Sequence, residues 1–159
     1  MTRIGVTGHM NITEDTVPLV YDEVATILAQ VESVDLVGIS CIARGADSVF
    51  AQAVLDAGGR LEVVLPSRNY RERKVKPDHA EQFDRLLRHA DAVHVMDFDD
   101  AGREAYEVAN EALVGLSDKL IAVWDSRPGE KGGTGTVVEL AREKGVPVEI
   151  VWPDGASRG

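Results

Sequence analysis

Short apolar runs alternate with longer amphipathic stretches along almost the whole chain. The runs have the length of buried strands and lie at residues 4–6, 36–39, 61–65, 92–96, 120–124 and 146–151. The stretches between them carry apolar residues at helical spacing, beginning near residues 16, 46, 79, 104 and 134. Six strands alternating with five helices predict right-handed crossovers and a parallel sheet with helices on both faces. We therefore expect a three-layer α/β/α fold with a mainly parallel sheet of about six strands.

The chain is long enough for one domain with a substantial core, at 159 residues. It contains neither an internal repeat nor a linker that would divide it. We expect residues 1–154 to form a single domain and residues 155–159 to be a frayed tail, since short polar termini are commonly disordered. In an open parallel sheet, ligands bind beyond the carboxyl ends of the strands. Residues that follow the strands are therefore the candidates for function.

Charge and composition exclude several classes of protein. The formal net charge is −10, which disfavours an extended nucleic-acid surface but leaves room for a mononucleotide in a local anion site. The single cysteine, Cys41, excludes an internal disulfide and a cysteine-rich zinc site. No apolar run approaches the roughly 20 residues of a membrane span, and the first residues lack the layout of a signal peptide. We expect a cytoplasmic protein without membrane association.

A glycine-rich turn between the fifth strand and the last helix is the most specific motif. It reads Gly132-Gly133-Thr134-Gly135-Thr136, with Glu139 one helical turn further on. Such a turn exposes backbone N–H groups at a helix N-terminus, where phosphate is the natural occupant. The sequence has neither the Lys-Ser/Thr pair of a P-loop nor the third glycine of a dinucleotide fingerprint. The alternative is a tight turn that serves only packing.

Two further loops follow strands and are expected to meet the same ligand. After the first strand come Thr7, Gly8 and His9, which offer polar side chains and a close backbone approach. A plain turn with a solvent-facing His is as good an interpretation of this loop. After the second strand come Ser40, Arg44, Gly45 and Asp47. Asp47 is either a ligand for a ribose hydroxyl or a first-turn carboxylate that the helix dipole favours. Arg44 either pairs with a phosphate or is solvated.

Three other segments lie in the right place. Trp124 and Asp125 lead into the glycine turn, where the indole could stack on a base or simply end a core strand. Residues 68–76 are strongly basic and include Arg71 and Arg73; they form either a lid that closes on phosphate or, more commonly, a solvated loop. Residues 97–100 are acidic, but nothing in their spacing defines a metal geometry, so no metal is expected.

Together the three loops resemble one Rossmann-like superfamily. Residues 40–47 resemble the Ser-Gly-x-Ala-x-Gly-x-Asp segment of the DNA-processing-A fold, with Cys41 at the first glycine. Residues 5–9 resemble the opening of SLOG domains, which usually carry Arg where this chain has Met10. Residues 132–139 match the Gly-Gly-x-Gly-Thr-x-x-Glu pattern of the Lonely Guy enzymes, with Lys131 in place of the preceding Pro. The likeness covers nearly the whole chain and is greatest to small stand-alone bacterial SLOG proteins.

The resemblance implies a nucleotide or nucleotide-derived ligand and leaves catalysis open. The first hypothesis is a SLOG-type sensor that only binds, in which Asp47 or Glu139 contacts a ribose hydroxyl. The second is a Lonely Guy-like nucleotide N-glycosidase, in which Glu139 would be the catalytic carboxylate. Ala109 and Asn110 stand where those enzymes carry an Arg-Lys pair, which disfavours the second hypothesis. Binding of single-stranded DNA is a third, disfavoured by the net charge and by an aromatic content of 5%. Neither a cofactor nor an oligomeric state follows from the sequence, although homodimers are the commonest assembly.

Overall fold

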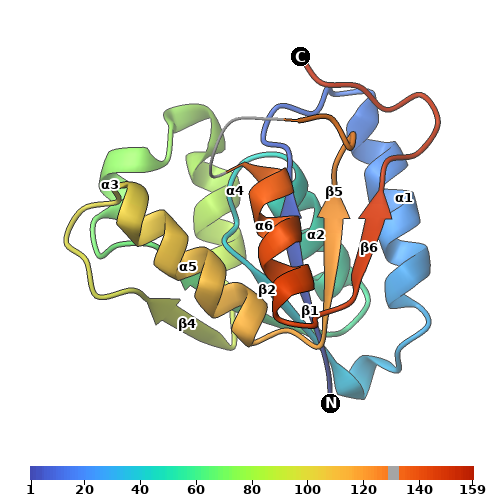
Figure 1. The fold of residues 1–159 in the computed structure, drawn as a ribbon, viewed down its shortest axis with the longest axis horizontal. Helices are drawn as coiled ribbons and strands as arrows, with labels where there is room; N and C mark the ends of the chain where they lie inside the picture. Colours follow the sequence, from blue (N-terminus) through green and yellow to red (C-terminus); the bar gives the residue numbers. More distant parts are fainter. Residues whose placement is uncertain (129–132) are drawn as a thin grey trace.

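The structure is a computed structural model, and it describes residues 1–128 and 133–159. A six-stranded sheet forms its centre, and all of its strand pairs are parallel. The strands are β1 (Thr2–Gly8), β2 (Leu36–Ser40), β3 (Arg60–Leu65), β4 (Ala92–Val95), β5 (Lys119–Val123) and β6 (Val148–Val151). The helices are α1 (Thr16–Leu28), α2 (Ala46–Asp56), α3 (Tyr70–Lys74), α4 (Pro77–Arg88), α5 (Arg103–Gly115) and α6 (Thr134–Glu143), and a 3₁₀ turn spans Ser33–Asp35. The predicted α/β fold is therefore confirmed (Figure 1).

The strand order β4-β3-β2-β1-β5-β6 contains one reversal of direction. From β1 the chain adds β2, β3 and β4 on one side, and it then returns to place β5 and β6 on the other side of β1. Register pairs Ile4 with Lys119 and Gly8 with Val123, so β1 and β5 end side by side. The loops that follow these two strands leave toward opposite faces of the sheet. A crevice opens between such loops, and in open α/β sheets it is the usual place for a ligand.

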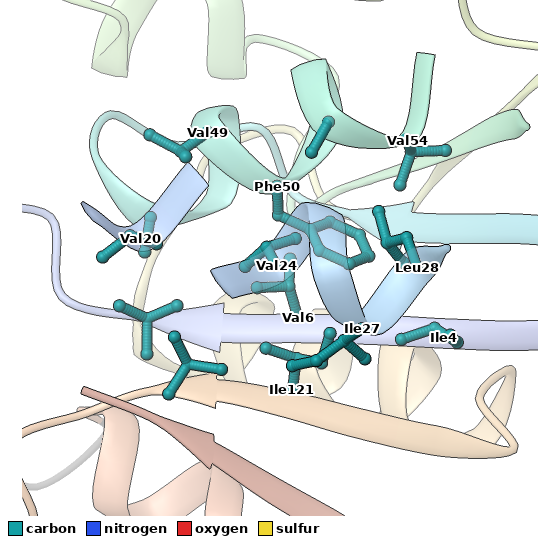
Figure 2. Packing of buried hydrophobic residues seen from close by; sticks show 14 of the residues in the cluster. Ile4, Val6, Val20, Val24, Ile27, Leu28, Val49, Phe50, Val54 and Ile121 are labelled. Carbon is teal, nitrogen blue, oxygen red and sulfur yellow. The ribbon is translucent and has the colours of Figure 1, made fainter. Parts of the chain in front are cut away.

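One face of the sheet is covered by α1, α2 and α4. Phe50 of α2 is fully buried there, among Val24 and Leu28 of α1 and Val6 of β1 (Figure 2). Farther along this face, Phe83 and Leu86 of α4 pack on β3. The apolar residues of α1 recur at helical spacing because one side of the helix faces the sheet and the other faces water.

The opposite face is covered by α5 and α6, which lie in front of the sheet in Figure 1. Leu113 of α5 and Val137 of α6 pack on Ile39 and Leu120 in a second core. Helices on both faces explain why β2 and β5 are almost continuously apolar rather than alternating. Within the described part of the chain, no helix is long and apolar enough to cross a membrane.

Two expectations about local structure need correction. Residues 68–76 are not simply a loop, because Tyr70–Lys74 form the short helix α3. Tyr70 is 8% exposed and packs near Phe83, and this anchor explains why a strongly polar segment becomes ordered. Residues 155–159 are hydrogen-bonded rather than frayed: the Thr13 N–H donates to the Ser157 carbonyl over 3.1 Å, and the Gly159 N–H donates to the Asn11 carbonyl over 2.8 Å.

Candidate functional site

A cavity of about 740 Å³ lies at the carboxyl edge of the sheet, at the reversal of strand order. Its volume falls in the range typical of small-molecule sites. The walls come from the ends of β1, β2 and β5, the segment after β3, the inner face of α5 and the start of α6. Of the residues predicted from sequence, those that line it are Thr7, Gly8, His9, Asp47, Trp124, Gly133, Thr134 and Gly135. Sequence elements far apart in the chain therefore share one cavity.

The glycine turn contributes three residues to the cavity wall. Gly133 is the N-cap of α6, and Thr134 and Gly135 begin the helix. A Cβ on Gly135 would lie 3.2 Å from the ring of Trp124, so the indole packs directly against this turn. The position allows the first N–H groups of α6 to face an anion in the cavity. Gly132 lies outside the described residues.

Thr136 and Glu139 face a different space. They line a smaller cavity of about 360 Å³, which adjoins the first and shares Trp124, Arg127 and Gly135 with it. Val137, between them, lines the larger cavity. Because successive residues of a helix point in directions about 100° apart, one helix can present different side chains to each space. Glu139 is exposed, and it does not share the cavity of Asp47 and His9.

His9 is buried at the bottom of the β1 loop. The Asp125 N–H donates to His9 Nε2 over 3.2 Å, and Arg158 Nη1 lies 3.3 Å from His9 Nδ1. Burial lowers the pKa of His9, and the charge of Arg158 lowers it further, against the opposing effect of the Asp125 carboxylate. The imidazole is therefore neutral near pH 7, and it joins the loops after β1 and β5 rather than facing solvent.

The C-terminal segment closes one side of the site. Arg158 lines the cavity, and its Nε contacts Asp125 Oδ2 over 3.0 Å. The Asp125 side chain is 8% exposed. Burial opposes its ionisation, yet the Arg127 N–H, His9 and Arg158 together hold the pKa of Asp125 below its ordinary value. Asp125 is thus an anchor for the surrounding loops, and its carboxylate is already occupied by protein donors.

The loop after β2 is organised by Ser40. Its buried hydroxyl accepts from the Ile42 N–H and donates to the Asp47 carbonyl, both over 3.0 Å. Ile42 has a positive φ of 45°, and its carbonyl lies 3.0 Å from His79 Nε2 of α4. Ser40 does not line the cavity. Its role in the structure is to hold a strained turn that places α2.

Glycine is required at position 45 because the backbone of the β1 loop passes close to it. The φ of Gly45 is +82°, and an added Cβ would lie 2.6 Å from the Met10 carbonyl oxygen and 2.7 Å from the His9 carbonyl oxygen. The Ala46 N–H donates to the same His9 oxygen over 3.2 Å. Gly45 does not line the cavity; it lets the start of α2 contact the β1 loop. The predicted close approach exists, but it is made to that loop.

Asp47 projects into the cavity from the first turn of α2. Burial raises the pKa of Asp47 to about 7, although the Ala43 N–H, which donates to the carboxylate, opposes the shift. Among the described residues, none places a cationic nitrogen within 4.0 Å of this carboxylate. A carboxyl group with such a shift, in a cavity and without an ion-pair partner, is typical of functional sites.

The predicted arginines are engaged elsewhere. Arg44 pairs with Asp78 of α4 and does not line the cavity. Arg71 makes a bidentate pair with Asp84, with distances of 2.7 and 2.9 Å. Arg73 does not line the cavity either. Within residues 68–76, Tyr70 and Lys74 line the cavity, and Lys74 is the basic one of the two.

The acidic segment after β4 binds a neighbouring side chain. Asp97 and Asp99 each accept from Arg68 over 2.9 Å, which ties this segment to the one after β3. In the described part of the chain, no three His, Cys, Asp or Glu residues are grouped to hold a metal ion.

The cavity residues that the sequence analysis did not select as site residues include Tyr70, Lys74, Tyr106, Asn110, Arg127 and Arg158. A signal existed for two of them. Tyr106, Ala109, Asn110 and Leu113 recur at helical spacing along α5, and all four line the cavity. No pattern marked Tyr70 or Arg158, because both are placed by tertiary contacts.

Comparison with known proteins shows the fold. No protein-family model and no curated protein matches the chain. Among solved structures, DNA processing protein A from Streptococcus pneumoniae matches with a TM-score of 0.71 and 18% identity over 98% of this chain and 52% of that one. The same protein from Helicobacter pylori, whose structure concerns single-stranded DNA binding, has a TM-score of 0.70 and 17% identity over 99% and 68%. The molybdenum cofactor binding protein of Rippkaea orientalis has a TM-score of 0.61 and 22% identity over 96% and 77%.

These likenesses establish a common architecture. The chain shares the Rossmann-like α/β fold of these proteins, as the sequence predicted. It spans about half the length of the pneumococcal protein.

Proposed function

We propose that the cavity binds a nucleotide or nucleotide-derived small ligand, with its phosphate at the N-terminus of α6. The observation that carries this proposal is the convergence of the glycine turn, the β1 loop and Asp47 on one cavity at the reversal of strand order. Backbone N–H groups of a helix start suit a phosphate, and a partly apolar cavity suits a base.

The local charge supports an anionic ligand in spite of the acidic chain. Lys74, Arg127 and Arg158 all line the cavity, and they come from three separate elements. Cationic side chains around a helix N-terminus add to the attraction of the backbone dipoles for phosphate. The net charge of −10 is therefore compatible with a mononucleotide in this cavity, and it disfavours a long polyanion.

Binding without catalysis is favoured over N-glycosidic hydrolysis. A glycosidase needs its carboxylate beside the bond that breaks. Glu139 is exposed and lines the smaller cavity, whereas Ala109 and Asn110 line the larger one in place of a basic pair. The protein is accordingly proposed to be a sensor or carrier of its ligand.

A thermal-shift screen tests the proposal. Nucleoside mono- and diphosphates, cyclic nucleotides, NAD and ADP-ribose should include compounds that raise the melting temperature in a saturable way. A parallel incubation with nucleoside monophosphates, assayed for free base, should remain negative. Release of base at an appreciable rate would establish the glycosidase instead. A salt-dependent mobility shift with single-stranded DNA, without any nucleotide effect, would establish DNA binding.

A further inference from the structure

One half of the cavity has a chemistry unlike that of the phosphate end. It is built by the segments after β2 and β3 together with α5, and we call it the inner subsite: Cys41, Asp47, Tyr70, Tyr106 and Asn110. These groups are close enough to influence one another electrostatically: Asp47 acts on both Cys41 and Tyr70, and Cys41 acts on Tyr106. The inner subsite is thus a compact cluster of side chains, none of which belongs to the glycine turn.

The walls of the inner subsite suit a flat ring. Tyr70 and Tyr106 meet edge to face, with ring centroids 6.4 Å apart and planes at 79°. Tyr70 is 8% exposed and fixed in the core, whereas Tyr106 is 40% exposed and presents its ring to the cavity. Burial raises the pKa of both phenols, so both stay neutral and can donate a hydrogen bond.

In its ionised form, the carboxylate of Asp47 only accepts hydrogen bonds. Because burial raises the pKa of Asp47 to about 7, a ligand that donates to this carboxylate would favour the ionised form. An ionised Asp47 offers two oxygens, and the structure supplies one donor to them, the Ala43 N–H. Two oxygens carry about four lone-pair sites, so the carboxylate keeps acceptor capacity toward the cavity. Leaving that capacity unused in a buried place is costly. The best complement is a ligand that presents two adjacent N–H donors.

The distance between Asp47 and the glycine turn indicates whether Asp47 would contact the ribose or the base of a nucleotide. Asp47 follows β2 and the glycine turn follows β5, and only β1 lies between these strands. Two strand spacings amount to roughly 10 Å. A ribose hydroxyl lies only a few bonds from its own 5′-phosphate, whereas the far edge of a purine reaches across such a span. The ribose role considered for Asp47 from the sequence therefore fits less well than a contact to the base.

We propose that the inner subsite recognises the aminopyrimidinone edge of a nitrogen heterocycle, as in guanine, through a two-point hydrogen bond from its ring N–H and exocyclic amine to Asp47. The ring itself packs against Tyr106. The assignment rests on the proposed function, because it takes the phosphate at α6 as the other anchor. The bound ligand would then have its anionic phosphate at one end of the cavity and the hydrogen-bond donors of its base at the other.

Calorimetric titration with four probes tests the assignment: GMP, IMP, AMP and ribose 5-phosphate. IMP lacks only the exocyclic amine, AMP presents an acceptor beside a donor, and ribose 5-phosphate lacks the base. GMP should bind the wild-type protein at least about tenfold more tightly than IMP or AMP, because a lost charged hydrogen bond changes affinity by about tenfold or more. Asp47→Asn should weaken GMP about 10- to 100-fold and leave ribose 5-phosphate unchanged.

Asp22→Asn, an exposed carboxylate of α1, is the matched control and should alter no titration. Equal binding of GMP and IMP to the wild-type protein, or a preference for AMP, would overturn the assignment while the proposed function stands. Loss of ribose 5-phosphate binding in Asp47→Asn would move Asp47 to the sugar and also overturn it. Absence of binding by all four probes would also overturn the assignment, and the thermal-shift screen would then decide the proposed function separately.

Discussion

Arg158 Nε lies 3.0 Å from Asp125 Oδ2, and this ion pair joins the end of the described chain to the loop after β5. Asp125 is almost fully buried, whereas Arg158 is 35% exposed. The carboxylate therefore depends on a partner that reaches in from the surface. Because Arg158 also lines the cavity, the same guanidinium takes part in stability and in the binding site.

Arg158→Gln should destabilise the protein by about 1–3 kcal/mol, because it leaves Asp125 buried without its cation. The destabilisation should become smaller in acid. The pKa of Asp125 is lower in the folded state than in the unfolded chain. The ionised carboxylate therefore stabilises the fold above its ordinary pKa of about 4, and this contribution disappears as the pH falls through the lower pKa of the folded state. Urea unfolding at pH 7 and pH 3 measures both effects. Arg103→Gln, whose partner Glu107 is exposed, should cost less than about 0.5 kcal/mol and serves as the control.

Asp47→Asn should make the protein more stable at alkaline pH. The pKa of Asp47 is raised to about 7, so the folded state keeps a proton that the unfolded chain releases from about pH 4 upward. The unfolding free energy of the wild type should therefore fall as the pH rises from 4 to 7. The amide does not titrate, so the variant should gain on the order of 1–3 kcal/mol at pH 8 and nothing near pH 4. Parallel stability curves for the two proteins over this pH range would contradict the raised pKa.

Gly45→Ala should be severely destabilising. The methyl group would face two carbonyl oxygens at 2.6 and 2.7 Å, at a φ of +82°. We expect a loss of about 3 kcal/mol or more, since strain and overlap add. Gly145→Ala is the matched control, because its φ is +75° but nothing lies within 4 Å, so only the conformational cost of about 1 kcal/mol applies. Similar melting temperatures for the two variants would show that the contact with the β1 loop is unimportant.

Gly135→Val should abolish nucleotide-induced stabilisation while the protein remains folded. The branched side chain would occupy the start of α6 and press on the ring of Trp124, which already lies 3.2 Å from an ideal Cβ. The anion would then lose its approach to the helix N–H groups. Gly115→Ala, in the last turn of α5 with open space around it, should leave the thermal shift unchanged. Full stabilisation of Gly135→Val by nucleotide would place the phosphate elsewhere.

Glu139→Gln tests whether any reaction occurs. If the protein only binds its ligand, both proteins should release no base, and affinity should change little because Glu139 lines the smaller, adjoining cavity and not the larger one. If it were a glycosidase, the wild type would turn over and the variant would be slower by about a hundredfold or more. Chromatography of nucleoside monophosphate incubations distinguishes these outcomes.

The fold could be predicted because its signals are local. Each strand is an apolar run bounded by turn residues, and α1 and α5 show a clear helical period. The helix α3 escaped prediction because its five residues are four charged side chains and Tyr70, and it is the burial of Tyr70 that holds it in place. Helix formation in so short a segment depends on tertiary packing, which a local pattern does not contain.

The site was only partly predictable for the same reason. Residues at or shortly after the strand ends, such as Gly8 and Asp47, follow from topology alone, since parallel strands end at one edge of the sheet. The role of a polar residue within such a loop depends on which way it points. Ser40 turns inward to the backbone and Arg44 turns outward to Asp78, and nothing in their spacing indicates either direction. The contribution of Arg158 required the tail to be packed, which its composition argued against.

The sheet order also governs when the site can come into being during synthesis. β1 is synthesised before the other strands of the sheet, yet one of its two neighbours is β5. Its second edge is therefore covered only after β5 has been made, when Ile4 can pair with Lys119. A nascent chain that ends before β5 exposes an apolar central strand, which is the kind of edge that attracts other chains. Such a fragment also lacks Trp124 and the glycine turn. Ligand added during translation should therefore bind and stabilise only chains that are nearly complete, and it should not assist the earlier steps of folding.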